Sequence, residues 1–143
     1  MKVKLLQIGD YVDYRGQIIK VTSLYDKGGS NEVGWSDKES VWVNADNVEP
    51  IQLEKLHLAK NGFEPTDETD REFVFCDGYN IKVLFDEGCE IYEQDGKTLF
   101  DKIPPSTLLT INFAEKDIWM PIEYVHELQH AMRIMGCDKT IEL

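Results

Sequence analysis

The fold of this chain is decided near its end by the stretch Pro121-Ile122-Glu123-Tyr124-Val125-His126-Glu127-Leu128-Gln129-His130-Ala131-Met132-Arg133-Ile134-Met135-Gly136. Pro121 suits the first helical position, where its missing N–H costs no hydrogen bond, and Gly136 suits a left-handed cap after the last turn. At about 100° per residue, four apolar side chains share one stripe: Val125, Leu128, Met132 and Met135. The stretch therefore predicts an amphipathic helix that packs its apolar stripe on the rest of the chain.

The same stretch contains His126-Glu127-x-x-His130, a pattern typical of zinc peptidases. Two histidines four residues apart share one helix face, and the intervening glutamate acts as general base. A catalytic zinc also needs a third protein ligand. In the extended metzincin motif this ligand is a third histidine, preceded by a glycine, but this chain has Gly136 at the histidine position and Arg133 at the glycine position. Because seven residues follow Gly136, we expect no second helix to supply a glutamate ligand. We predict a surface helix with two exposed histidines and no cofactor, with a zinc-dependent hydrolase as the alternative.

Length and composition predict a globular protein. A chain of 143 residues with 42% hydrophobic residues suits one domain, or two very small ones, with a real core. Its apolar runs are too short to span a membrane, and its first residues lack the pattern of a signal peptide. The three cysteines, Cys76, Cys89 and Cys137, lack Cys-x-x-Cys spacing. We therefore expect reduced thiols in a cytoplasmic protein.

The net charge of −12 is unevenly distributed. Residues 1–50 carry 6 basic and 8 acidic side chains, whereas residues 51–143 carry 9 and 19. Acidic surfaces repel phosphate backbones, so nucleic-acid binding is not expected. An acidic surface suits a basic protein partner, although it can also serve solubility alone. The candidate acidic binding residues are Asp67, Glu68, Asp70 and Glu72.

Residues 1–50 contain short apolar runs separated by closely spaced turn residues, which predicts a small SH3-like β-barrel. Barrels of this kind can present aromatic side chains as a peptide groove or as a cage for a methylated cation. The alternative is that the aromatics fill a small core. Because Val41 and Val43 share one strand face, Trp42 is expected on the other, exposed face. The candidate aromatic binding residues are Tyr11, Trp35 and Trp42.

Pro50 marks the boundary to a second unit, residues 51–143. A short amphipathic helix comes first, as predicted by the spacing of Leu53, Leu56 and Ala59. Alternating apolar residues and hairpin signals at Asp77-Gly78 and Asp95-Gly96 then predict an antiparallel β-meander. We expect residues 114–117 to turn the chain toward the final helix, which packs on the sheet. The predicted fold class is therefore α+β.

Three segments carry a family resemblance: Ile8-Gly9-Asp10-Tyr11-Val12, the join from Val48 through Leu53 to Lys60-Asn61-Gly62-Phe63, and Tyr124-Val125-His126-Glu127-Leu128-Gln129-His130-Ala131. Together they resemble small uncharacterised proteins of Bacteroides-type gut bacteria and their phages. That group has no established activity to transfer to named residues. The resemblance implies a setting, namely a phage or mobile-element accessory protein that acts on a host protein, with counter-defence as one role.

These observations predict a non-enzymatic interaction protein that binds a protein partner. The observations behind this prediction are that the sequence offers no complete set of catalytic residues, that residues 51–143 are acidic and that the N-terminal unit is rich in aromatic residues. Two alternatives remain open. One is zinc-dependent hydrolysis through His126, Glu127 and His130, and the other is a protein that sequesters a small molecule, for which the sequence locates no pocket.

Overall fold

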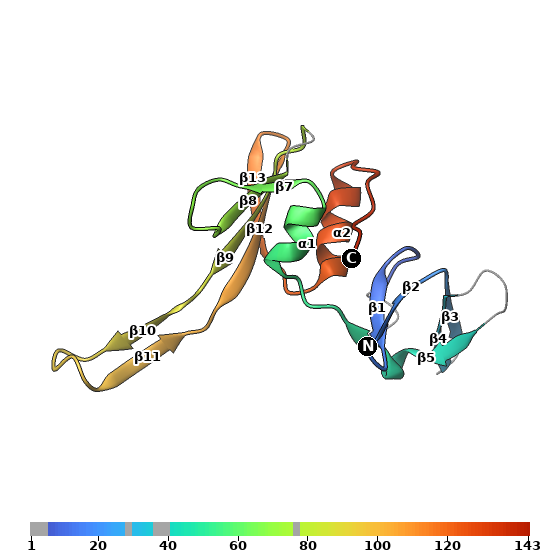
Figure 1. Ribbon diagram of the computed structural model, residues 1–143, viewed down its shortest axis with the longest axis horizontal. Coiled ribbons are helices and arrows are strands. Elements are labelled where there is room, and N and C mark those ends of the chain that lie inside the picture. Colours follow the sequence, from blue (N-terminus) through green and yellow to red (C-terminus); the bar gives the residue numbers. More distant parts are fainter. Residues whose placement is uncertain (1–5, 28–29, 36–40, 76–77) are drawn as a thin grey trace.

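The computed structural model describes residues 6–27, 30–35, 41–75 and 78–143 of the chain. These residues are mainly β with two α-helices, which confirms the α+β class. Figure 1 shows an N-terminal group of short strands, two helices beside a larger sheet, and a thin two-stranded arm that leaves this sheet. Neither helix in the described part of the chain has the length and apolar character that crossing a bilayer requires.

The N-terminal unit consists of two antiparallel three-stranded sheets. One has the order β2 (Gln17–Lys20), β1 (Tyr11–Tyr14), β6 (Glu49–Pro50). The other has the order β3 (Ser23–Lys27), β4 (Ser30–Gly34), β5 (Trp42–Asn44), and a short 3-10 helix, η2 (Ala45–Asn47), follows it. A small buried cluster belongs to this unit: Leu6, Val12, Ile19, Val21, Val33, Ala45 and Val48.

Both sheets of the N-terminal unit are open, so the closed barrel predicted for residues 1–50 is not found in the described residues. Closure requires hydrogen bonds between edge strands. In the part of the chain that the structure describes, no edge strand of one sheet pairs with an edge strand of the other: β2 and β6 pair with β1, and β3 and β5 pair with β4.

The C-terminal unit contains a five-stranded antiparallel sheet. Its spatial order is β13 (Lys116–Pro121), β12 (Ser106–Phe113), β9 (Ile81–Asp86), β8 (Glu72–Phe75), β7 (Phe63–Pro65). The predicted turn at residues 114–117 is shorter than expected, because Ala114 and Glu115 reverse the chain with positive φ. The following residues form β13 along the length of β12, and Pro121 ends this strand instead of starting the last helix.

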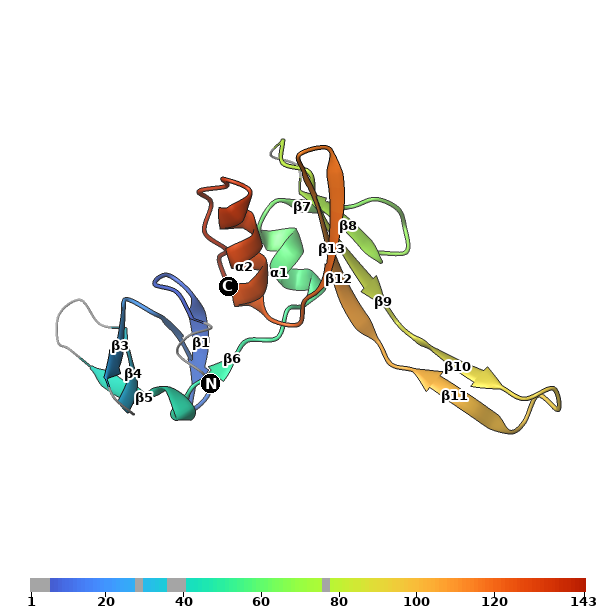
Figure 2. The same ribbon diagram turned by 180° about the vertical axis from the view of Figure 1, so that it is seen from behind.

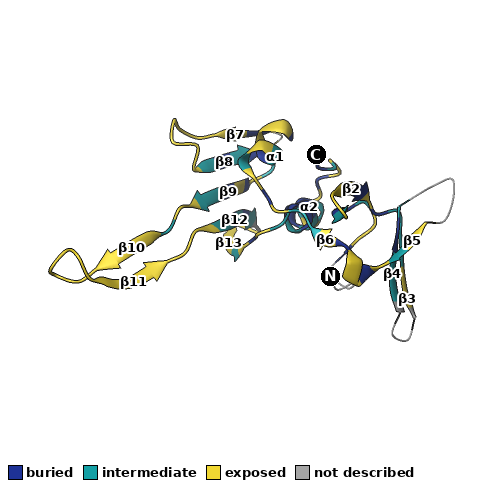
Figure 3. Cartoon of the chain, turned by 60° about the horizontal axis from the view of Figure 1, so that its bottom comes forward, coloured by how far each residue is buried: buried dark blue, intermediate teal, exposed yellow. Residues whose placement is uncertain are grey.

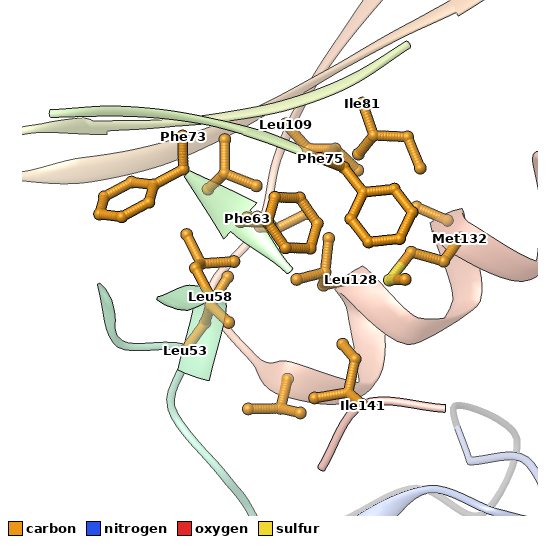
Figure 4. Packing of buried hydrophobic residues seen from close by; sticks show 14 of the residues in the cluster. Leu53, Leu58, Phe63, Phe73, Phe75, Ile81, Leu109, Leu128, Met132 and Ile141 are labelled. Carbon is orange, nitrogen blue, oxygen red and sulfur yellow. The ribbon is translucent and has the colours of Figure 1, made fainter. Parts of the chain in front are cut away.

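Two helices cover one face of this sheet, α1 (Lys55–Lys60) and α2 (Val125–Ile134) (Figures 1 and 2). Val125, Leu128 and Met132 of α2 are buried, as the apolar stripe predicts. In α1 the buried side chain is Leu58, whereas Leu56, which the spacing placed inward, is exposed. Figure 4 shows the core between helices and sheet, in which Phe63 and Phe75 pack with ring centroids 4.8 Å apart.

Beyond the sheet, the chain continues from β9 into a hairpin formed by β10 (Cys89–Tyr92) and β11 (Leu99–Ile103), and it returns as β12. The hairpin signal at Asp95-Gly96 is therefore confirmed, while Asp77 of the other predicted hairpin lies outside the described residues. We call residues 86–106 the arm. All nine strand residues of β10 and β11 are exposed (Figure 3).

Candidate functional site

The polar face of α2 contacts the N-terminal unit instead of solvent. His130 Nε2 lies 2.9 Å from Asp10 Oδ2, and Arg133 Nη1 lies 3.4 Å from Asp10 Oδ1. Arg133 also donates to Gln7 Oε1 at 2.7 Å. Asp10 is only 1% exposed, and His126 is buried beside this contact at 5% exposure. The prediction of two exposed histidines is therefore wrong, because the N-terminal unit covers the helix face on which they lie.

We call Gln7, Asp10, His130 and Arg133 the joint between the two units. Asp10 Oδ2 also accepts a hydrogen bond from the Gln7 backbone N–H at 2.7 Å, which closes a tight turn. Gly9 within this turn has a φ of +95°, and a Cβ there would lie 2.9 Å from Arg133 Nη2. The positive φ of this turn therefore favours glycine.

His126 contacts the rings of two neighbours in the same helix region, stacked on one and edge-on to the other. Its ring lies nearly parallel to that of Tyr124, with centroids 5.8 Å apart, and 5.6 Å from the ring of His130. Its buried Nδ1 has no hydrogen-bond partner. Burial lowers the pKa of His126, while Asp10 and Glu127 act in the opposite direction. The neutral imidazole is therefore favoured in the folded protein.

The side chain of Glu127 caps the N-terminus of α2. Its Oε2 accepts hydrogen bonds from the backbone N–H groups of Glu123 at 2.7 Å and Tyr124 at 3.0 Å, as the third helical residue of a capping box does. Among the described residues, no three His, Cys, Asp or Glu side chains form a group that could hold a metal ion. Zinc at His126 and His130 stays the untested alternative to the predicted lack of a cofactor, and Glu127 would then have to leave its cap to act as base.

The predicted aromatic residues lie in three separate contacts. Trp42 is 39% exposed and meets Tyr25 edge-on at 6.3 Å. Trp35 is half-buried, packs against the small cluster and lies 5.4 Å from the ring of Tyr14. The ammonium of Lys20, the cross-strand neighbour of Tyr11, lies 5.6 Å from the centroid of the Tyr11 ring. In the described residues, the three aromatics are thus distributed over different pairs and do not form one cage.

The predicted acidic residues lie in and after an exposed turn. Asp67 Oδ1 accepts hydrogen bonds from the backbone N–H and the hydroxyl of Thr69, at 2.9 and 2.5 Å, and these bonds lower its pKa. Glu68 and Asp70 are exposed, and Asp70 has a φ of +50°. Glu72 belongs to β8 and lines a hollow of about 270 Å³ on the sheet face away from the helices.

The arm is a surface that the sequence did not single out. Five large apolar side chains are exposed on it: Ile91, Tyr92, Leu99, Phe100 and Ile103. Phe100 is 71% exposed and lies at a bulge where β10 and β11 shift register. The Tyr92 hydroxyl bonds the carboxylate of Glu90, which raises the pKa of the phenol. Alternation predicts strands here, but it does not indicate that no other element covers them.

A groove of about 700 Å³ lies at the base of the arm. Its walls come from the end of β9, the start of β12, the link from β13 to α2, and the linker before α1. That linker is held to the start of α2 by two backbone hydrogen bonds, Leu53 N to Glu123 O at 2.8 Å and Val125 N to Ile51 O at 2.9 Å. The charged side chains of the lining are Asp86, Glu87, Glu123, Glu127 and Lys55.

Comparisons of the chain with protein-family models, curated proteins and solved structures find no match. The resemblance of three of its segments to proteins of gut bacteria and their phages therefore stays a prediction. Function has to be inferred from the geometry of the joint, the arm and the groove.

Proposed function

We propose that this chain is a non-enzymatic protein-binding protein whose arm makes the main contact with its partner. The observation that carries the proposal is the exposure of five large apolar side chains on a two-stranded ribbon. An exposed apolar patch on a soluble protein marks an interaction surface. A lone two-stranded hairpin is also only marginally stable in water, so contact with a partner would add the support that the arm lacks.

The apolar residues suit a protein interface in kind as well as in number. Tyrosine and phenylalanine dominate the energetics of many interfaces, because they bury a large area with few rotatable bonds. Full burial of one such side chain contributes about 1.5–3 kcal/mol before the costs of association. Burial of Tyr92, Leu99 and Phe100 together would therefore supply much of the affinity of a specific complex.

The charge of the arm indicates the nature of the partner. Residues 86–106 contain six acidic side chains and two lysines. A second copy of this acidic chain would be repelled, and so would a nucleic acid. A protein with a basic, partly apolar surface is the complementary partner.

Two further assignments belong to this proposal. The SH3-like identity of residues 1–50 is supported by two small antiparallel sheets around one buried cluster. The setting is supported only by the resemblance, which implies a phage or mobile-element accessory protein that acts on a host protein in the bacterial cytoplasm. Trp42 and the acidic turn with Asp67 would then be secondary contact surfaces.

Capture of a partner from bacterial lysate tests the proposal. Leu99→Ser with Phe100→Ser removes two exposed apolar side chains of the arm, and Ile118→Ser with Trp119→Ser removes two exposed ones from β13 as a matched control. We expect the control variant to capture the same proteins as the unmodified chain, and we expect the arm variant to lose them. If the arm variant captures the same proteins in the same amounts, the arm is not the binding surface.

A further inference from the structure

The groove at the base of the arm has the charge and shape to receive a cationic side chain. We propose that it binds a lysine or arginine of an extended partner segment that continues along the arm. This inference rests on the proposed function and adds the chemistry of the segment that the partner contributes. Three features of the structure support it: the charges of the groove, its apolar walls and the free edges of the arm.

Four carboxylates line the groove together with one ammonium. Asp86 ends β9 and Glu87 follows it, whereas Glu123 precedes α2 and Glu127 lies in the first turn of that helix. Glu127 is held by its capping hydrogen bonds, and Glu87 lies 3.5 Å from the exposed guanidinium of Arg71. The excess of negative charge converges from two elements that are distant in sequence, which favours a cation from a partner.

A cation already occupies part of this groove. The ammonium of Lys55 lies 5.8 Å from the centroid of the Phe85 ring, which is a cation–π distance. Pro105 and Pro121 contribute further apolar lining, as do the buried Leu53 and Ile122. The methylene stem of a lysine or arginine can pack on such apolar surfaces while its charged end reaches the carboxylates.

The groove is continuous with the arm. Asp86 and Glu87 lead into β10, and Pro105 and Ser106 follow β11, so the same residues line the groove and begin the arm. Within the described residues, β10 and β11 pair only with each other, and each has one edge without a partner strand. An extended segment can add to such an edge by backbone hydrogen bonds, while alternate side chains contact the apolar residues.

Fluorescence anisotropy with two labelled peptides tests this inference on the full chain. One octapeptide alternates lysine and valine, and its twin alternates glutamate and valine. We expect the basic peptide to bind at least about tenfold more tightly than the acidic one. Three results would overturn the assignment of an extended basic segment: equal affinity for the two peptides, undetectable binding of the basic peptide, or displacement of the basic peptide by an equal concentration of spermidine, a cation without a peptide backbone.

Charge reversal locates the site. Glu87→Lys with Glu123→Lys should weaken binding of the basic peptide about tenfold or more. Glu49→Lys with Asp138→Lys changes the net charge by the same amount at exposed positions outside the groove, and it should weaken binding less than about threefold in physiological salt. Equal loss in the two variants would show that general attraction, and not the groove, binds the peptide. If the melting temperature of the groove variant is lower than that of the unmodified chain, the milder variant Glu87→Gln with Glu123→Gln replaces it.

Failure of this inference is distinguishable from failure of the proposed function. If the arm variant loses its captured partner while groove variants bind the basic peptide as the unmodified chain does, the arm binds a protein but the groove takes no cation. If the arm variant keeps its partner, the proposed function fails irrespective of peptide affinity.

Discussion

The imidazole of His130 and the carboxylate of Asp10 lie 2.9 Å apart although 120 residues separate them in sequence. Asp10 is buried in the turn that begins the first sheet, and His130 lies in the middle of the last helix. This contact and the one from Arg133 attach the small N-terminal unit to α2. A buried carboxylate with charged partners is costly to disturb, since removal of one partner leaves the others desolvated.

Asp10→Ala should destabilise the protein by about 2–4 kcal/mol, because three donors lose their acceptor in a mostly buried contact. The donors are the Gln7 backbone N–H, His130 and Arg133. Urea unfolding followed by tryptophan fluorescence measures the change. Asp13→Ala is the matched control, since Asp13 also accepts a turn N–H, from Gly16 at 2.7 Å, but in an exposed position. Equal costs for the two variants would show that the joint contributes no stability.

The helix could be predicted from the sequence because its information is local. The spacing of Val125, Leu128 and Met132 fixes which face of α2 is apolar, whatever the rest of the chain does. The burial of His126 could not be predicted in this way, because it depends on a loop from the other end of the chain. A polar helix face that is covered by a polar loop has the same pattern as one that faces solvent.

Strand pairing was partly predictable for the same reason. Alternation located β9 and β12, whose residues Val83 and Leu109 face each other in the core. Alternation did not predict β13, because its residues do not alternate between apolar and polar. Every residue of β13 except Met120 is exposed. The strands of the arm were located as well, but the pattern of a strand does not indicate whether a partner sheet or helix covers it.

His126 should make the protein less stable in mild acid. Its pKa in the folded protein lies below the ordinary value of 6.5, so the unfolded chain takes up a proton that the folded one resists. The stability that neutral His126 contributes is complete above about pH 6.5 and is lost as the pH falls toward the pKa of the folded state. The free energy of unfolding then changes by at most about 1.4 kcal/mol per pH unit.

His126→Phe isolates that contribution, because phenylalanine keeps a flat ring beside Tyr124 but does not titrate. Urea unfolding at about pH 7.5 and about pH 5.5 should show a smaller loss of stability in the variant than in the unmodified chain. All other ionisable groups are the same in both proteins. The same pH dependence in both would mean that burial of His126 has no effect on its protonation.

Gly88→Ala should loosen the base of the arm. Gly88 has a φ of +71°, and a Cβ there would lie 2.2 Å from the carbonyl oxygen of Ile103 on the opposite strand. Hydrogen exchange measured by mass spectrometry should therefore quicken throughout residues 86–106. Gly96→Ala at the tip is the matched control: its φ is +69° with open space around it, so it bears only the conformational cost of about 1–2 kcal/mol. Similar exchange in both variants would show that the close approach at Gly88 does not hold the strands together.

Glu127→Ala should cost about 1 kcal/mol of stability, because two backbone N–H groups at the start of α2 lose their acceptor. The zinc-hydrolase alternative makes a different prediction for the same residue, namely loss of activity without loss of stability. Elemental mass spectrometry of untagged protein separates the two. We expect far less than one zinc per chain, because the carboxylate of Asp10 already accepts hydrogen bonds from His130 and Arg133. Stoichiometric zinc that is lost in His126→Ala, together with an unchanged stability of Glu127→Ala, would instead favour the hydrolase.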